Sequence, residues 1–187
     1  MGEITLTRPF PKIIHGVHGH LSREEAWFLL EIPSKLGAGI YAELGTCCGR
    51  SAILVAEGIR QNSLVDTFVH TVDYFPDKDA ENKAGASYDI AVSNIKDKGL
   101  DHLIKMHIGD SAKTAEEFED YSVKFLFIDA DHDYGSVKRD YEAWEQKIMP
   151  GGVIAFHDSS LPSISRLLNE TGKPFNFVES IAWREMP

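Results

Sequence analysis

The sequence contains little cysteine, no excess of basic residues and no long apolar run. Its two cysteines, Cys47 and Cys48, are adjacent, so they cannot join distant parts of a fold. They also lack the spacing of a Cys-x-x-Cys redox pair or a zinc site, and we interpret them as small buried residues. No apolar stretch approaches the roughly 20 residues of a membrane span, and residues 1–12 lack the apolar core of a secretory signal. These absences predict a cytoplasmic protein that does not enter a membrane.

The charge balance argues against nucleic acid as a partner. The chain has 19 basic and 29 acidic residues, a formal net charge of −10, whereas phosphate binding requires clustered Lys and Arg. A small neutral or cationic substrate, or a metal ion, suits this charge better. With 187 residues, the chain has room for one domain. We expect residues 1–38 to form a helical cap region and residues 39–187 to form the core of that domain.

Apolar periodicity predicts strands and helices in regular alternation. A capping box at Ser22 and Glu25 predicts the start of the first helix, which continues through the apolar residues 26–32. Alternation of this kind predicts an α/β fold with a doubly wound, mostly parallel sheet and helices on both faces. The expected strands cover 40–43, 69–73, 104–110, 123–129 and 153–158, the later helices lie near 52–59, 88–98, 112–119, 137–147 and 163–169, and 175–184 form a final strand or hairpin.

The run from Glu43 to Ser51 is typical of a cofactor site, because an apolar strand there breaks into a glycine-bounded turn before a helix. Such a turn brings backbone amides and a helix N-terminus to a ligand. Its Gly-x-x-x-Gly spacing differs from the Gly-x-Gly-x-x-Gly of dinucleotide enzymes and favours S-adenosylmethionine (SAM). Glu43 would accept hydrogen bonds from an ammonium group or orient the turn. The alternative is a tight turn without a ligand. The expected cofactor-binding residues here are Glu43, Gly45, Thr46, Gly49 and Ser51.

Five predicted strands end at an acidic residue, and parallel strands bring such ends to one edge of the sheet. Taken singly, each acid is more typical of a helix cap or a turn. Together they would repel one another unless a ligand or a metal compensates them. Asp73 is the expected ribose ligand, and Gly109, Asp110 and Ser111 would lie beside an adenine, with a plain helix cap as the alternative. The five acids are Glu43, Asp73, Asp110, Asp129 and Asp158.

The segment from Asp129 to Tyr134 carries three carboxylates and a histidine at the end of a buried strand. Carboxylate oxygens are preferred ligands of Mg²⁺, and we expect Asp129, His157 and Asp158 to hold a divalent cation. Unperturbed histidine titrates near neutral pH, so we expect His132 to act as the base that deprotonates a substrate hydroxyl. In the alternative interpretation, the aspartates at 131 and 133 cap the next helix and His132 is solvated.

These motifs resemble the class I SAM-dependent methyltransferases, in particular the metal-dependent catechol, caffeoyl-CoA and macrocin-type O-methyltransferases. The similar stretches are Glu43–Ser51, Phe127–Tyr134 and Gly151–Asp158, within a resemblance that covers residues 20 to 160. It implies a Rossmann-like methyltransferase fold, SAM as cofactor with Asp129 beside it, and methyl transfer to a hydroxyl of a small-molecule acceptor with help from Mg²⁺ or another divalent cation. His132 replaces the family's lysine, and His157 replaces the first residue of its second metal pair.

Two other functions fit the same pattern. A NAD-dependent oxidoreductase would use a similar sheet, although the missing Gly-x-Gly-x-x-Gly counts against it. A protein that binds SAM without turnover would retain the nucleoside contacts and lose the acceptor site. Only about 29 residues follow Asp158, so little sequence remains for an acceptor lid. The acceptor is therefore expected to be small, or a second subunit of a homodimer would close the site.

Overall fold

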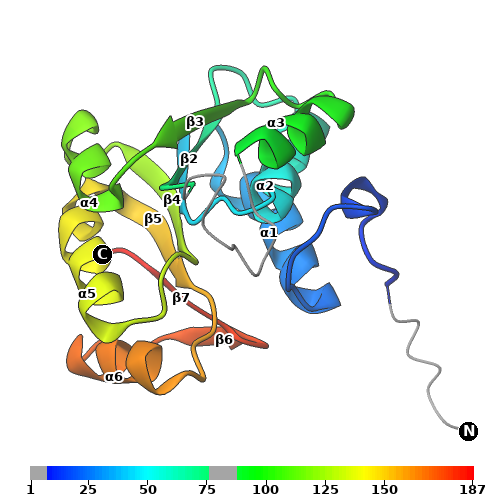
Figure 1. Ribbon diagram of the computed structural model, residues 1–187. Coiled ribbons are helices and arrows are strands. Elements are labelled where there is room, and N and C mark those ends of the chain that lie inside the picture. Colours follow the sequence, from blue (N-terminus) through cyan, green and yellow to red (C-terminus); the bar gives the residue numbers. More distant parts are fainter. Residues whose placement is uncertain (1–7, 76–87) are drawn as a thin grey trace, which may run out of the picture.

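One twisted sheet organises the molecule (Figure 1), as a computed structural model of residues 8–75 and 88–187 describes it. Residues 1–7 of the predicted cap region lie outside the described residues. The sheet has the strand order β3-β2-β1-β4-β5-β7-β6. The strands β1 to β5 run parallel, and β7 is antiparallel to both β5 and β6. Their bounds are β1 Ile40–Leu44, β2 Phe68–Asp73, β3 Ile104–Ile108, β4 Val123–Ile128, β5 Ile148–Phe156, β6 Asn176–Val178 and β7 Ile181–Glu185.

Helices cover both faces of the sheet, which confirms the predicted doubly wound α/β fold. On one face lie α1 (Arg23–Leu36), α2 (Arg50–Gln61) and α3 (Tyr88–Asp97), and on the other lie α4 (Ser111–Thr114), α5 (Tyr134–Trp144) and α6 (Pro162–Glu170) (Figure 1). Three single 3-10 turns complete the described elements: η1 Lys12–Ile14, η2 Ala115–Glu117 and η3 Glu145–Lys147. None of the helices in the described part of the chain is long and apolar enough to cross a membrane.

Alternating side chains of the central strands supply two separate cores. In β4, Phe125 and Phe127 pack with α1 and α2, whereas Leu126 and Ile128 pack with α5 and α6. Successive side chains of a strand point to opposite faces, so a strand covered on both faces must be apolar throughout. This explains the continuous apolar run Phe125–Ile128 in β4 and shows which core each of these side chains joins.

The first helix begins where the capping box predicts. The Ser22 hydroxyl accepts a hydrogen bond from the Glu25 amide (3.2 Å), and the Ser22 amide donates to Glu25 Oε2 (2.7 Å). Two otherwise unpaired amides of the first turn are thereby satisfied. The carboxylate of Glu25 is thus held at the start of α1, with consequences for the site described below.

Several element boundaries differ from the expected ones. The strand β5 begins at Ile148 rather than at 153, because Ile148 pairs with Val123 of β4 and because Gly151 and Gly152 form backbone hydrogen bonds with Met186 beside β7. The helix predicted at 112–119 is one turn of α-helix followed by a 3-10 turn. The helix α5 begins at Tyr134 rather than 137, and the chain's last segment forms the hairpin β6–β7. None of these differences changes the sheet order.

Candidate functional site

A cleft lies along the carboxyl ends of the parallel strands and consists of two adjoining hollows. The His132 hollow, of about 290 Å³, is lined by His18–Leu21, the turn after β1, His132 and Asp158. The Asp73 hollow, of about 300 Å³, is lined by Asp73, Gly109, Ser111 and neighbouring residues. Both hollows share the residues Gly45, Cys47, Asp129 and Ala130. A ligand with two chemically different ends can therefore span both, with its middle against the turn after β1.

The turn after β1 is pressed against the end of β4. Gly45 adopts a left-handed conformation with φ +96°, and a Cβ atom at this position would lie only 2.1 Å from the backbone oxygen of Asp129. The Gly45 amide donates to Val72 O, and the Asp129 amide donates to Leu44 O. Gly49, also left-handed at φ +81°, caps the start of α2. Glycine is required at Gly45 both for the backbone angle and for the close approach.

The two adjacent cysteines have different surroundings. Cys48 is buried, as predicted for both residues, and its backbone oxygen accepts a hydrogen bond from Asn94. Cys47 is half-buried and lines both hollows. Both thiols are free and their sulfur atoms lie 3.9 Å apart. Burial raises the pKa of the Cys47 thiol to about 12, so its uncharged form faces the cleft.

Glu43 lies beneath the turn and is not among the residues that line either hollow. Its side chain is 3% exposed and accepts a hydrogen bond from Thr71 Oγ1 at 3.0 Å. Burial raises the pKa of Glu43 to about 8, against the opposing effect of hydrogen bonds from Ser51 and Thr71. Thr46 bonds to the Thr71 hydroxyl. Of the two predicted uses of Glu43, this geometry matches orienting the turn, while Thr46 and Ser51 line the His132 hollow.

Asp73 ends β2 and faces the cleft. Its Oδ2 accepts from the Cys47 amide (2.8 Å) and its Oδ1 from the Phe75 amide (2.9 Å). These bonds fix the carboxylate without using all of its lone pairs, since each carboxylate oxygen accepts about two hydrogen bonds. Asp73 can therefore accept bonds from two hydroxyl groups of a ligand in the Asp73 hollow, as a ribose ligand would require.

The loop after β3 serves mainly its own helix. Asp110 accepts a hydrogen bond from the Lys113 amide (3.0 Å) and pairs with Arg139 (3.2 Å), and the bond from Lys113 lowers the pKa of Asp110. The Ser111 hydroxyl bonds to Asp140. Asp110 therefore forms the helix cap that was the alternative interpretation. Gly109 and Ser111 line the Asp73 hollow, and their contact with an adenine stays a prediction.

Two of the three aspartates between β4 and α5 are also structural. Asp133 Oδ2 accepts from the Gly135 amide (2.9 Å) at the start of α5, and Asp131 Oδ1 accepts from the Asp133 amide (3.1 Å). His132 is not simply solvated, because its Nε2 lies 2.9 Å from Asp158 Oδ2. Asp129, His132 and Asp158 are thus the residues of this region that face one another across the His132 hollow.

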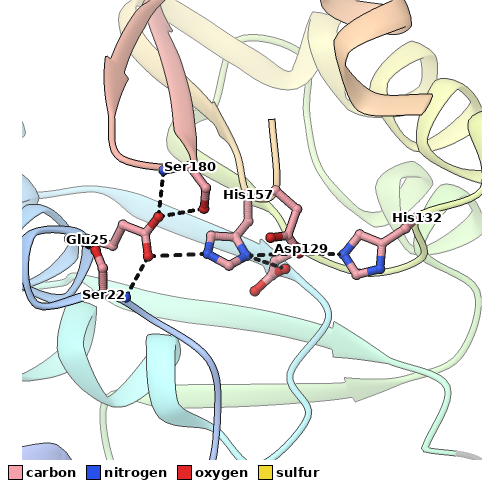
Figure 2. Close-up of polar contacts among 7 residues, drawn as sticks. Ser22, Glu25, Asp129, His132, His157 and Ser180 are labelled. Atoms are coloured by element: carbon pink, nitrogen blue, oxygen red, sulfur yellow. Dashed lines mark hydrogen bonds and ion pairs between the residues drawn. The ribbon is translucent and has the colours of Figure 1, made fainter. Parts of the chain in front are cut away.

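His157 is buried and its ring nitrogens face three carboxylates, two at Nδ1 and one at Nε2 (Figure 2). Its Nδ1 is 3.1 Å from Asp129 Oδ1 and 3.4 Å from Asp158 Oδ2, and its Nε2 is 3.5 Å from Glu25 Oε2. Burial alone would lower the pKa of His157, but Asp129 and Glu25 outweigh it and raise the pKa to about 10. Burial raises the pKa of Glu25, yet its contacts with His157 and Ser180 prevail and lower it to about 2. His157 is thus an internal cation.

The donor set fits a divalent cation, although with a membership different from the predicted one. Among the described residues, Asp129, His132 and Asp158 each offer one ligand atom, and these atoms lie within 4.8 Å of one another. The predicted set contained His157, whose two ring nitrogens instead face carboxylates. Two carboxylates with one imidazole suit Mn²⁺, Fe²⁺ or Zn²⁺ better than Mg²⁺, which prefers oxygen ligands.

Sequence reasoning did not identify Glu25 as part of this site. Its capping-box role was visible, and that role by itself explains a glutamate three residues after a serine. The sequence gives no further sign of a role for Glu25 in the site. Its contact with His157 joins α1 to the end of β5, and these two segments lie far apart in the chain. The N-terminal segment His18–Leu21, which lines the His132 hollow, was likewise not predicted and carries no recognisable motif.

This chain belongs to the family of methyltransferase domains, whose family model matches residues 42–159. It is a class I SAM-dependent methyltransferase. The matched residues include the turn after β1, Asp73, Asp129, His132, His157 and Asp158. Family membership decides against the NAD-dependent alternative.

Known proteins support the fold in more detail. The O-methyltransferase NovP superposes with a TM-score of 0.77 at 16% identity, over 90% of this chain and 82% of NovP. An O-methyltransferase from Bacillus cereus in complex with SAH gives a TM-score of 0.65 at 20% identity, over 95% and 90% of the two chains. Identities this low show the fold alone. The uncharacterized protein y4gI of Sinorhizobium fredii is 41% identical over 46 residues, which span 25% of this chain and 5% of that protein.

Proposed function

We propose that this enzyme transfers the methyl group of SAM to a hydroxyl group of a small molecule. The observation that carries the proposal is the pair of hollows that share the turn at Gly45. Asp73 would bind the ribose hydroxyls at one end, and the methionine part would lie along Thr46 and Ser51 toward the other. The acceptor would then lie between His18–Leu21 and His132. The names of NovP and of the Bacillus cereus protein, both O-methyltransferases, support oxygen as the accepting atom.

The geometry supports His132 as the base. The contact of Nε2 with Asp158 (2.9 Å) favours a proton on Nε2, which leaves the lone pair of Nδ1 for the acceptor. SAM supplies a methyl group on a positively charged sulfur. As the acceptor oxygen bonds to this methyl carbon and the carbon–sulfur bond breaks, His132 Nδ1 takes the hydroxyl proton. Asp158 stabilises the imidazolium that results, and positioning of the two reactants supplies most of the remaining rate enhancement.

A divalent cation is the second use of the same residues. Asp129, His132 and Asp158 would hold it, and a bound cation would lower the pKa of an acceptor hydroxyl and orient it. His132 Nε2 cannot both bind a cation and donate a hydrogen bond to Asp158. The two roles therefore predict different responses to chelation, and only the cation role requires added metal.

The test combines binding and turnover. SAM and SAH binding is measured by calorimetry, and methyl transfer to a panel of catechols, sugars and other hydroxylated small molecules is followed by mass spectrometry. Each assay is run after exhaustive chelation and again with added Mn²⁺ or Mg²⁺. Turnover that survives chelation supports His132 as the base, and turnover restored only by metal supports the cation role. Binding of SAH with no product on any acceptor would overturn the proposal in favour of SAM binding without turnover.

A further inference from the structure

A line of charged side chains connects the His132 hollow with the start of α1 (Figure 2). Asp129 lies at the hollow, His157 lies behind it, and Glu25 lies on the far side of the imidazole ring. The distances are 3.1 Å from Asp129 Oδ1 to His157 Nδ1 and 3.5 Å from His157 Nε2 to Glu25 Oε2. The second is an ion-pair contact that is too long for a good hydrogen bond. Catalysis as described above uses neither His157 nor Glu25.

Glu25 is held by hydrogen bonds from two other segments of the chain. Its Oε1 accepts hydrogen bonds from the Ser180 amide (2.8 Å) and hydroxyl (2.5 Å), between β6 and β7, and its Oε2 accepts from the Ser22 amide (2.7 Å) before α1. The residue is only 3% exposed. A buried carboxylate with this many donors has one orientation available, so Glu25 is a rigid anchor for whatever it faces.

The His157 ring has no comparable anchor of its own. It is 6% exposed and packs edge-on against Phe127, with ring centroids 6.0 Å apart. Apolar packing against one ring leaves rotation about the side chain to be set by the partners of the two nitrogens. Nδ1 faces the carboxylate of Asp129 and Nε2 faces that of Glu25. Removing the charge of Glu25 would free one end of the ring and, with it, the orientation of Asp129.

We propose that Glu25 is a positioning residue, which holds the His157 ring so that the ring in turn holds the Asp129 carboxylate toward the His132 hollow. Glu25 also fixes the start of α1, and residues His18–Leu21 directly before it line the same hollow. The wall of the hollow and the carboxylate within it are thus set by one side chain. The kinetic part of the test rests on the proposed function, whereas the spectroscopic part does not.

The variants are Glu25→Gln and, as a matched control, Ser22→Ala. Glutamine preserves the size of the side chain and removes its charge. The Ser22→Ala variant removes the hydroxyl that accepts from the Glu25 amide but leaves the carboxylate and its contact with His157. Both changes weaken the same capping box, so both are expected to lower the thermal stability. A role of Glu25 confined to helix stability would therefore make the two variants alike.

The first measurement is NMR of protein labelled with ¹⁵N-histidine, with the His157 signals assigned through a His157→Gln variant. In Ser22→Ala, the ring signals of His157 are expected to match those of the wild type. In Glu25→Gln, the signals of both ring nitrogens are expected to shift, at Nε2 beside position 25 and at Nδ1 beside Asp129, because the ring is no longer held in one orientation. Ring signals in Glu25→Gln identical to those of the wild type overturn the proposal. This comparison requires no acceptor, so it decides the matter whether or not methyl transfer is observed.

The second measurement is kinetic, on an acceptor that the wild type methylates. Glu25→Gln is expected to lower kcat about tenfold, because small misplacement of a reacting group is costly, with KM for SAM within about twofold of the wild-type value. Ser22→Ala is expected to retain kcat and to lose only thermal stability. An unchanged kcat in Glu25→Gln overturns the proposed role of Glu25 and leaves the proposed function unaffected. Absence of turnover in the wild type overturns the proposed function and leaves the NMR result to judge Glu25.

Discussion

The two ends of the cleft are built in different ways. At the Asp73 end, the carboxylate is held by two backbone amides, of Cys47 and Phe75, close to the turn that ends β1. At the His132 end, charged side chains from α1 and from the segments after β4 and β5 face one another, and the Ser180 hydroxyl in the β6–β7 turn bonds to one of them. Backbone hydrogen bonds therefore position the carboxylate at the Asp73 end, whereas contacts between charged side chains position the groups at the His132 end.

This difference has consequences for how each end tolerates change. Backbone amides remain in place when a nearby side chain is replaced, so a substitution at the Asp73 end is expected to remove a ligand contact without disturbing the surrounding structure. A buried group of charges is costly when one member is removed, because its partner is left unpaired. We therefore expect substitutions at the His132 end to affect turnover strongly and SAH binding weakly, and substitutions at the Asp73 end to do the reverse.

The largest expected difference between the two ends comes from His132→Ala, which should change kcat and leave SAH binding nearly unchanged. Removing a general base lowers kcat by about 10²- to 10⁴-fold, whereas SAH affinity by calorimetry is expected to stay within about twofold, since Asp73 and the Gly45 turn are untouched. His15→Ala serves as the control, because that side chain is exposed and the fold uses the His15 backbone oxygen. A kcat for His132→Ala equal to that of the wild type would remove His132 from the mechanism.

Gly45→Ala is expected to damage both ends together, because the turn is shared. The new methyl group would lie 2.1 Å from the backbone oxygen of Asp129, at φ +96°, so β4 must shift. Gly172→Ala is the matched control: its φ is +61° and nothing lies within 4 Å of the added atom. The control is expected to lose only about 1 kcal/mol of stability, from left-handed backbone strain. Gly45→Ala should lose clearly more stability, and SAH affinity as well. Thermal unfolding and SAH calorimetry measure both effects, and equal losses in the two variants would contradict the close approach.

Asp73→Asn addresses the Asp73 end alone. Loss of charge-assisted hydrogen bonds to a ligand's hydroxyls is expected to weaken SAH binding by about 10- to 100-fold, with little change in thermal stability. Asp110→Asn provides the comparison, because asparagine is also a good helix cap and Asp110 is not among the residues that line the hollow. We expect its SAH affinity to stay within about twofold. Equal losses of SAH affinity in the two variants would indicate that Asp110 contacts the cofactor, as the sequence predicted.

Glu43→Gln is expected to have the smallest effect on function. Its carboxyl group lies beneath the turn, so SAH affinity should change by less than about twofold. Stability should change with pH: the native pKa of about 8 lies above the ordinary value of 4.5, so folding retains a proton that the unfolded chain loses. The free energy of unfolding of the wild type therefore falls as the pH rises from 4.5 to about 8. The fall is up to about 1.4 kcal/mol per pH unit.

The Glu43→Gln variant should lack this contribution. Denaturant unfolding at about pH 5 and about pH 7 compares the two proteins, and parallel pH dependence would contradict a protonated Glu43. A large loss of SAH affinity would instead favour the other predicted use of Glu43, as an acceptor of hydrogen bonds from an ammonium group.

Most of the fold was predictable because its signals are local. The capping box at Ser22 predicted the start of α1, and the apolar residues of β4 predicted a buried strand. Boundaries were less predictable where distant segments decide them. The start of β5 depends on the pairing of Ile148 with Val123 of β4 and of Gly151 with Met186, and the helix near 112–119 shortens to one turn. Neither Gly151 nor residues 112–119 carry a local sign of these outcomes.

The candidate site shows the same division. Asp73 and the Gly45 turn were recognisable because strand, turn and helix are contiguous, and the strand-end acids were expected to share one edge. Which acids serve the cleft was not predictable, since capping and ligand binding favour the same residues. Asp110 and Asp133 cap helices, Glu43 lies beneath the turn, and Asp129 and Asp158 face the hollow.

The sequence by itself determined the class of fold, the methyltransferase resemblance and the motif that opens the cleft, because periodicity and glycine placement act over neighbouring residues. Only the tertiary structure decided the partner of His157, which sequence reasoning expected to bind a metal and which instead lies between Glu25 and Asp129. A charge is neutralised by whatever lies within a few ångströms of it, and that neighbour is chosen by the packing of α1 against the end of the sheet.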